Sequence, residues 1–260
     1  MRKILNFLKF SFLFLVLGLC GLLLWISGHY VIPIMMYHHV DYVDEQRSDT
    51  VSPENFKRHM AFLKQNDYNV ISLESYILGK KEQKKFPRNT VVITFDDAYD
   101  DNFVHAFSVT NEYNFPVTLF VPSTEVGTEG IMNKKQLRQL LDMGVTIGSH
   151  SLNHTYLPDA PYAKQVEEIH DSKTDLERML DIKVDYFAYP IGGFSKKIKK
   201  VVRSAGYKAA MATNRGYDKA NNDLFEINRI KFSDNDDDSF TLWIKLSGYF
   251  NIFRKEKSPF

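Results

Sequence analysis

Residues 91–97 read Val-Val-Ile-Thr-Phe-Asp-Asp, an apolar run with β-branched residues that ends in two adjacent carboxylates. Such a run predicts a buried strand of a parallel sheet. A second run of this character, residues 145–149, is followed by two histidines four residues apart, His150 and His154. Because ligands of α/β sheets and barrels gather at the carboxyl ends of strands, we expect both motifs to meet at one rim of the fold.

Together these polar side chains provide the donor set of a metal site. One aspartate and two histidines form a three-ligand set for a zinc-like ion with one coordination position open, which is typical of catalytic sites. Both rings can face one ion if the chain turns helically after Ser149. The remaining aspartate is then free to act as a base on a water. The alternative interpretation is that Asp96 and Asp97 cap a helix and that both histidines are surface residues.

Three motifs of the chain resemble those of a known family. Residues 94–97 (TFDD), 149–154 (SHSLNH) and 187–192 (FAYPIG) look like the first three motifs of the polysaccharide deacetylases of carbohydrate esterase family 4, the NodB-homology fold. The resemblance extends from about residue 33 to residue 232. Residues 34–40 (IMMYHHV) and 227–230 (INRI) are similar to the branch that contains bacterial poly-β-1,6-N-acetylglucosamine deacetylases.

The chain also departs from the commoner family pattern. Ala98 stands where most members have Gly, Ala188 where they have Arg, and Ile191 where they have an aromatic residue. The Leu-x-His motif that supplies the general acid in most members is missing, since no histidine follows His170. The poly-N-acetylglucosamine branch is similar in lacking this late histidine, and the resemblance implies that His38 takes its place.

The resemblance implies a metal-assisted hydrolysis of an amide. Asp97, His150 and His154 would hold one divalent ion, expected to be Zn²⁺, which lowers the pKa of a water and polarises the acetamide carbonyl. Asp96 would act as the base and His38 as the acid that protonates the departing amine. The loop that lines the substrate would consist of Tyr189, Pro190, Ile191 and Gly192. A backbone N–H of this loop would stabilise the oxyanion.

The expected reaction is the removal of N-acetyl groups from an extracellular polysaccharide that contains N-acetylglucosamine, with release of acetate. The branch resemblance implies a poly-β-1,6-linked polymer, and peptidoglycan or chitin-like β-1,4 chains are the alternative. A hypothesis of another class is a membrane-tethered carbohydrate-binding protein with a degenerate site. The sequence does not determine the sugar linkage, the physiological metal or the oligomeric state.

Alternating strands and helices are predicted along residues 31–260, which we expect to form one catalytic domain of barrel size. This βα repetition implies a parallel sheet, and the number of units fits a distorted, incomplete (β/α) barrel. Strands are predicted at residues 32–37, 69–71, 91–95, 117–121, 145–149, 186–189, 208–212 and 226–230. Helices are predicted from residue 53, at 73–78, through 103 and 107, at 134–143, within 162–180, at 196–205, and through 240–246.

Residues 1–30 have the pattern of a membrane-targeting segment. Arg2, Lys3 and Lys9 precede an uncharged stretch, residues 10–29, that is rich in Leu and Phe. The stretch is long enough for a transmembrane helix, and the positive flank predicts a cytoplasmic N-terminus. Because no small-x-small cleavage site follows the apolar core, we expect an uncleaved single-pass anchor, with the catalytic domain outside the cytoplasmic membrane. The alternative is a cleaved signal and a secreted domain.

Composition limits the remaining possibilities. The chain has 33 basic and 32 acidic residues, so its net charge of +1 gives no indication of nucleic-acid binding. Its single cysteine, Cys20, lies in the apolar segment, so the domain has neither a disulfide nor a thiol nucleophile. His59, His105 and His170 are expected to be surface or partly packed residues. His38 and His39 are adjacent, and neighbours on a strand point to opposite faces, so only one of them can face the site if the strand is regular there.

Overall fold

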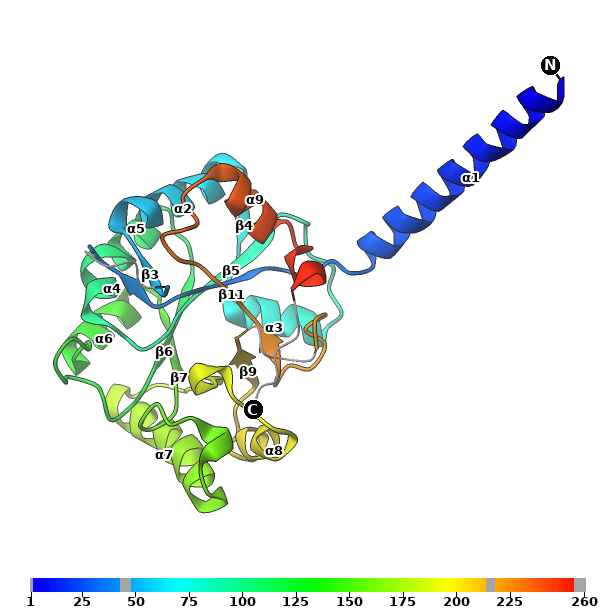
Figure 1. Cartoon of the computed structure of the whole chain (residues 1–260). Helices are drawn as coiled ribbons and strands as arrows, with labels where there is room; N and C mark the ends of the chain where they lie inside the picture. Colours follow the sequence, from blue (N-terminus) through cyan, green and yellow to red (C-terminus); the bar gives the residue numbers. More distant parts are fainter. Residues whose placement is uncertain (1, 43–47, 214–217, 255–260) are drawn as a thin grey trace.

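A parallel sheet that nearly closes into a barrel forms the body of the protein (Figure 1). In the computed structural model, which describes residues 2–42, 48–213 and 218–254, the strand order is β10-β9-β8-β7-β6-β5-β1-β11, with β4 beside β5. Each strand pairs in parallel with its neighbours. The bounds are β1 (Ile34–Tyr37), β4 (Asn69–Val70), β5 (Thr90–Phe95), β6 (Val117–Val121), β7 (Thr146–Ser149), β8 (Tyr186–Ala188), β9 (Ala209–Ala212), β10 (Ile227–Asn228) and β11 (Ile230–Lys231).

The two ends of the strand order are neighbours in the sequence. Strand β10 pairs with β9 and strand β11 pairs with β1, and only Arg229 separates β10 from β11. This short segment therefore brings the two sides of the sheet together and makes the barrel nearly complete. The predicted α/β fold, a distorted and incomplete barrel, is confirmed.

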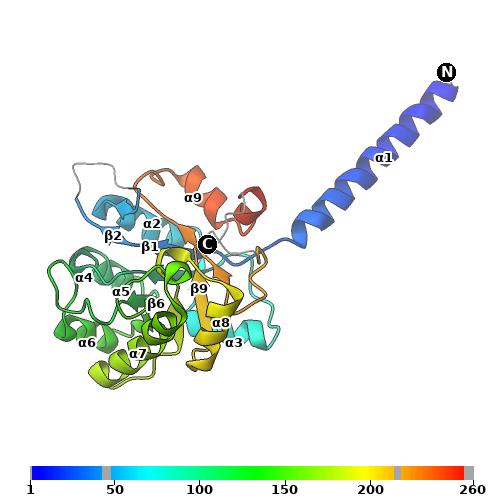
Figure 2. The same cartoon turned by 60° about the horizontal axis from the view of Figure 1, so that its bottom comes forward.

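Helices surround the strands, as Figure 2 shows from a second direction. A separate small sheet is formed by β2 (His39–Val40) and β3 (Thr50–Val51). The α-helices are α1 (Arg2–Ser27), α2 (Pro53–Gln65), α3 (Leu73–Lys81), α4 (Asp100–His105), α5 (Phe107–Glu112), α6 (Lys134–Asp142), α7 (Tyr162–Leu180), α8 (Lys196–Ser204) and α9 (Ser239–Leu246). Short 3₁₀ helices are η1 (Leu157–Asp159), η2 (Pro190–Gly192) and η3 (Phe250–Phe253).

Strand residues alternate between two apolar cores. One set, including Met35, Ile93 and Leu119, belongs to the large cluster that also contains residues of the surrounding helices. The other set, including Ile34 and Val92, packs with residues of α3 in a second cluster. Side chains alternate along a strand. Residues that follow a strand and keep the same alternation as the second set therefore point into the open carboxyl end of the barrel.

Two local expectations need correction. A single helix was predicted through Phe103 and Phe107, but α4 and α5 are separate helices that meet at Ala106, whose ψ of −50° is helical while its φ is −103°. His59 was expected to be a surface or partly packed residue, but it is fully buried, with Nδ1 3.0 Å from Tyr37 Oη and Nε2 2.7 Å from the carbonyl of Asp236. The polar groups around His59 satisfy its ring, which makes burial of this residue tolerable.

The N-terminal helix α1 extends away from the barrel (Figure 1). Its segment Phe10–Ser27 has a mean hydropathy of 2.4 and none of it is buried. By length and composition this segment could cross a membrane, a property that it shares with signal sequences.

Candidate active site

The candidate metal ligands meet at the carboxyl end of the barrel. Asp97 follows β5, and His150 and His154 follow β7. Their donor atoms all lie within 4.8 Å of one another. Asp97 Oδ1 is 3.4 Å from His150 Nε2 and 3.3 Å from His154 Nε2. Residues that are far apart in the sequence thus form one cluster, as the positions of the motifs predicted.

This cluster fits a tetrahedral metal ion. Oxygen and nitrogen ligands about 2.1 Å from zinc stand about 3.4 Å apart in tetrahedral geometry, which matches the two distances from Asp97 Oδ1. Asp97 Oδ1 is buried and accepts no hydrogen bond from the residues that the structure describes. His150 Nδ1 lies 2.8 Å from the carbonyl of Ala188, which can accept its N–H and leave Nε2 as the free donor atom. Burial lowers the pKa of His150 despite the adjacent carboxylates, so the neutral, ligating form is favoured.

The backbone around these ligands is unusual. Asp97 and Ala98 have φ values of 70° and 59°, and Ser151 and His154 have values of 67° and 51°. Left-handed backbone costs a residue with a side chain about 1–2 kcal/mol, so the surrounding contacts must hold it. Ala98 is also the position where the commoner family motif has Gly, which adopts this conformation without that cost.

A buried carboxylate supports the loop that carries the two histidines. Glu168 on α7 accepts hydrogen bonds from the backbone N–H groups of Leu152 (3.0 Å) and Asn153 (2.9 Å). It also accepts from Asn153 Nδ2 and Thr155 Oγ1, each at 2.8 Å. Burial alone would raise the pKa of Glu168, but these hydrogen bonds outweigh it and lower the pKa. Glu168 therefore remains ionised and fixes the chain between His150 and His154.

The second aspartate, Asp96, has a different environment. Arg229, which is fully buried, makes a two-point contact with its carboxylate, Nη1 to Oδ1 at 2.7 Å and Nη2 to Oδ2 at 2.6 Å. Arg229 also donates to the carbonyl of Ala212 and to Thr94 Oγ1, each at 3.2 Å. Burial acts to raise the pKa of Asp96, but the charge of Arg229 and the nearby histidines lower it well below its usual range. Asp96 is thus a fixed carboxylate, with Oδ2 3.8 Å from His150 Nε2.

The paired histidines His38 and His39 turn to opposite sides of their segment. His39 Nδ1 lies 2.6 Å from Asp101 Oδ2, and its ring stacks on Tyr99 with a centroid distance of 3.5 Å. The His38 ring interacts electrostatically with Asp96 and Asp97, which act to raise its pKa, but burial dominates and lowers it. Its buried Nδ1 has no hydrogen-bond partner among the described residues. His38 is therefore the member of the pair that faces the site.

The loop after β8 divides into buried and open parts. The Tyr189 side chain is fully buried, donates to the carbonyl of Phe225 at 2.9 Å and stacks on Phe194. Phe187 is also fully buried, so both rings pack in the core and have no surface to offer a sugar. Pro190 and Gly192 are buried too, whereas the Ile191 side chain is 50% exposed, on left-handed backbone with a φ of 57°. The open part of this loop is thus Ile191.

Comparison with known proteins agrees with this geometry. Residues 83–210 match the sequence model of the polysaccharide deacetylase family. The chain carries a polysaccharide deacetylase domain. The Bacillus subtilis protein YxkH, named as a polysaccharide deacetylase, is 27% identical over 202 residues, which are 78% of this chain and 71% of YxkH. The poly-β-1,6-N-acetyl-D-glucosamine N-deacetylase of Staphylococcus aureus is 27% identical over 215 residues, covering 77% of this chain and 73% of that enzyme.

The fold of the deacetylase domain agrees with solved structures. The Streptococcus pyogenes deacetylase PplD, solved in complex with acetate, superposes with a TM-score of 0.73 at 26% identity, covering 78% of this chain and 93% of PplD. The three candidate metal ligands, Asp97, His150 and His154, lie inside the stretch that matches the family, as do Asp96 and the loop at residues 189–192. His38 and Arg229 lie outside residues 83–210, so their place in the site comes from the structure.

Sequence reasoning missed the contact between Arg229 and Asp96. The signal was present, since residues 227–230 were noted for their resemblance to one branch of the deacetylases, and Ala188 stands where other members have Arg. Nothing in the local pattern shows that Arg229, between two short strands near the end of the chain, pairs its guanidinium with the carboxylate of Asp96 after β5. The nearly closed barrel brings these positions together.

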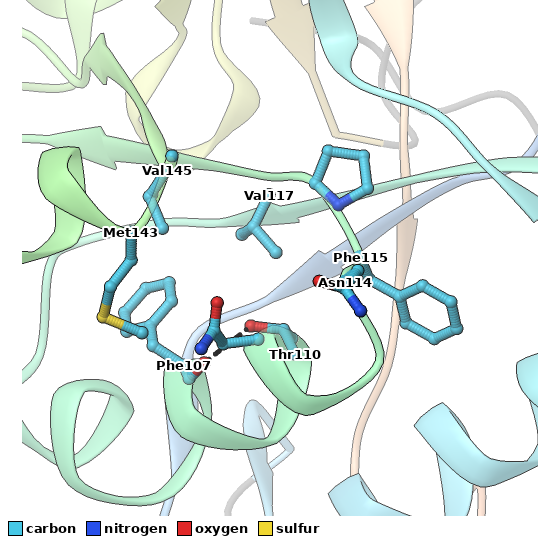
Figure 3. Close-up of a pocket in the computed structure, with 10 residues that line it drawn as sticks. Phe107, Thr110, Asn114, Phe115, Val117, Met143 and Val145 are labelled. Atoms are coloured by element: carbon cyan, nitrogen blue, oxygen red, sulfur yellow. Dashed lines mark hydrogen bonds between the residues drawn. The ribbon is translucent and has the colours of Figure 1, made fainter.

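A pocket of about 230 Å³ at the opposite end of the barrel has another character (Figure 3). Its lining includes Val117 at the start of β6, Val145 just before β7, and Phe107 and Thr110 of α5. None of its lining residues is titratable. The pocket offers neither metal ligands nor a general base, so we do not assign the deacetylase chemistry to it.

Proposed function

We propose that this deacetylase removes N-acetyl groups from an extracellular poly-β-1,6-N-acetylglucosamine-like polysaccharide, using one divalent metal ion and releasing acetate. The observation that carries the proposal is the cluster of Asp97, His150 and His154 with a second, Arg-paired carboxylate beside it. The likeness to the Staphylococcus aureus enzyme supports the choice of polymer.

The proposed ligands are Asp97, His150 and His154, and the expected ion is Zn²⁺. When bound, such an ion supplies a Lewis acid for the acetamide carbonyl and lowers the pKa of a water. The carbonyl of Ala188 orients the His150 ring. Glu168 holds the loop that places His154. These contacts set the ligand geometry before an ion arrives.

Asp96 is proposed as the base, with Oδ2 directed to the cluster. The two-point contact with Arg229 fixes the carboxylate and keeps it ionised, while each oxygen keeps a further lone pair for a proton. A carboxylate with a depressed pKa is a weak base, so it does not retain a proton that it accepts. The proton can then pass to solvent, which restores the carboxylate, while the amine nitrogen takes its proton from a separate acid before the C–N bond breaks.

His38 is proposed as the acid that supplies a proton to the departing amine. Its ring lies within electrostatic range of Asp96 and Asp97, and its Nδ1 is free of protein partners among the described residues. The lowered pKa makes the protonated ring a stronger acid but a less populated one. We assign stabilisation of the oxyanion to a backbone N–H of the loop at residues 189–192, where Ile191 is the open residue.

Residues 1–30 are proposed as an uncleaved anchor, and residues 31–260 as the catalytic domain outside the cytoplasmic membrane. The apolar segment Phe10–Ser27 and its basic N-terminal flank support this arrangement. In this arrangement the catalytic domain and the extracellular polysaccharide are on the same side of the membrane.

Acetate release tests the proposed function. The purified full-length chain, loaded with Zn²⁺, is incubated with β-1,6- and β-1,4-linked N-acetylglucosamine oligomers, and the His150→Ala/His154→Ala variant serves as the inactive control. We expect acetate from the β-1,6 oligomers, with little from the β-1,4 series. Faster release from β-1,4 oligomers would change the polymer to a peptidoglycan or chitin-like chain. Binding of either oligomer without acetate release would favour a carbohydrate-binding protein.

A further inference from the structure

We propose that helix α9 rests on the outer surface of the membrane, with Phe240 and Trp243 in the lipid interface. This inference concerns a surface remote from the catalytic cluster and depends on the proposed anchor. The occupant to which the surface is assigned is the lipid bilayer that surrounds α1.

Helix α9 has an unusual distribution of apolar side chains. Leu242 and Leu246 are buried against the domain, as expected for the inner face of a surface helix. Its outer face is also apolar, since the Phe240 side chain is 68% exposed and that of Trp243 is 57% exposed. The two exposed rings stack with a centroid distance of 6.2 Å and form one continuous aromatic surface.

The end of α1 is attached to the domain beside α9. The backbone N–H of Val31 donates to the carbonyl of Gly248 at 2.8 Å, and Tyr30 Oη donates to the carbonyl of Arg88. The Tyr30 ring packs edge-on against Tyr249. A side chain at Gly248 would collide with the Tyr30 ring, since an added Cβ would lie 2.2 Å from it. The chain is therefore fixed to the domain only a few residues after α1 ends at Ser27.

A shared cavity shows how close α9 comes to the apolar segment. Leu22, Trp25 and Ile26 of α1 line one cavity of about 730 Å³ together with Trp243 and Ile244 of α9. The three α1 residues belong to the segment Phe10–Ser27 that could cross a membrane. Trp243 and Ile244 therefore lie near the last turns of that segment. If those turns are in the bilayer, Trp243 reaches the depth of its interface.

The chemistry of the surface fits this position. Tryptophan is enriched at membrane interfaces because its ring is apolar while its N–H can still bond to water or headgroups. Amphipathic helices at the interface bury their apolar side chains about 5–10 Å into the boundary between headgroups and acyl chains. The short attachment to α1 and the lipid contact of α9 would together hold the domain in one orientation on the membrane.

Fluorescence quenching tests this placement in the full-length chain, which has two tryptophans, Trp25 and Trp243. The Trp25→Phe variant, reconstituted in phosphatidylcholine–phosphatidylglycerol vesicles, leaves Trp243 as the only emitter. We expect lipids with a quencher near the headgroup to remove more of its emission than lipids with a quencher deep in the chains, and aqueous iodide to have little effect. Phe240→Ser in this background should reduce the lipid quenching.

The Trp243→Phe variant reports whether α1 is inserted, because lipid-borne quenchers should then act on Trp25. As a matched control, Tyr162→Trp is introduced on α7 in a chain whose two native tryptophans are replaced by Phe; Tyr162 is 52% exposed. Its emission should respond to iodide and not to lipid quenchers. The proposal is overturned if Trp243 behaves like this control or if lipid quenchers do not reach Trp25. It is also overturned if Trp243 is shielded from both quenchers, because that result would indicate that a protein, such as a second copy of the chain, covers α9.

Discussion

The two ends of the barrel strands differ in chemistry more than in shape. At the carboxyl end, Asp97, Ser151 and His154 adopt left-handed backbone, and Asp97 Oδ1 is buried without a hydrogen-bond donor among the described residues. At the amino end, the pocket of about 230 Å³ beside β6 and β7 is lined by neutral side chains. Strain and unpaired polar atoms persist only where surrounding structure maintains them, and they concentrate at functional sites. Left-handed backbone alone does not separate the two ends, since Asn114 in the pocket lining has a φ of 53°. The comparison teaches that clustered ionisable side chains with an unpaired buried oxygen identify the active site better than a hollow does.

The largest effect should follow from removing metal ligands at the carboxyl end. His150→Ala and His154→Ala should each lose most of the bound metal, because one of three protein ligands is removed. Elemental analysis of the purified chain measures this loss. His170→Ala, a histidine of α7 outside the cluster, is the control and should keep the metal. Full metal occupancy in the double variant His150→Ala/His154→Ala would refute the ligand assignment.

The adjacent carboxylates should separate into two phenotypes. Asp96→Asn should abolish turnover and retain metal, whereas Asp97→Asn should weaken metal binding itself, because a ligand must supply charge to the ion. Asp96→Asn also leaves the Arg229 guanidinium buried without a counter-ion, which typically costs about 3–5 kcal/mol of folding stability. Acetate assays, metal analysis and thermal unfolding are measured on both variants. Loss of metal in Asp96→Asn alone would show that the roles are reversed.

Replacing the proposed acid should give a smaller but clear loss. His38→Ala should lower kcat by about 10²–10⁴-fold with metal content unchanged, because that is the usual contribution of general acid catalysis. His39→Ala is the natural control, since His39 points to Asp101 instead of the site. Near-normal kcat in the His38 variant would require another proton donor.

An intermediate effect on metal affinity should come from Glu168, which touches no proposed ligand directly. Glu168→Gln keeps the shape but weakens the hydrogen bonds to the loop between the two histidines. Loss of such outer contacts typically lowers metal affinity about 10–100-fold. Glu167→Gln is the matched control, because the carboxylate of Glu167 is exposed and pairs with Lys164. Equal metal dissociation constants in the two variants would contradict a positioning role.

The smallest effect is expected at the amino end of the barrel. Asn111→Ala in the lining of the opposite pocket should leave kcat, KM and metal content unchanged. Its effect on stability should remain within about 0.5 kcal/mol, as for most exposed substitutions. A loss of deacetylation comparable to that of the His38 variant would mean that the two ends are coupled, and the comparison drawn above would fail.

Much of the fold could be predicted because its signals are local. The β-branched run before Asp96 became β5, and side-chain caps marked helix starts, as where Ser52 accepts from the N–H of Asn55 at the start of α2. The meeting of Asp97, His150 and His154 also followed from a local rule, since parallel strands place their carboxyl ends at one rim. The opposite orientation of His38 and His39 agrees with the prediction, although His38 lies between β1 and β2 and not within a strand.

The unpredicted features depend on contacts between distant segments. His59 could be buried only because Tyr37 and Asp236 satisfy its ring, and neither partner is visible in the pattern of its own helix. The partner of Asp96 is Arg229, on the far side of the sequence. The open side chain of Ile191 depends on a left-handed turn that the residue type disfavours. Tertiary structure decides such positions, so sequence periodicity does not reveal them.

The position of Arg229 between the two closing strands ties catalysis to the completion of the barrel. Synthesis from the N-terminus completes Asp97, His150 and His154 first, and Arg229 only near the end of the chain. Until β10 and β11 pair with β9 and β1, Asp96 has no fixed cation beside it. We therefore expect a chain truncated before β10 to lack deacetylase activity even where it retains the proposed ligands Asp97, His150 and His154.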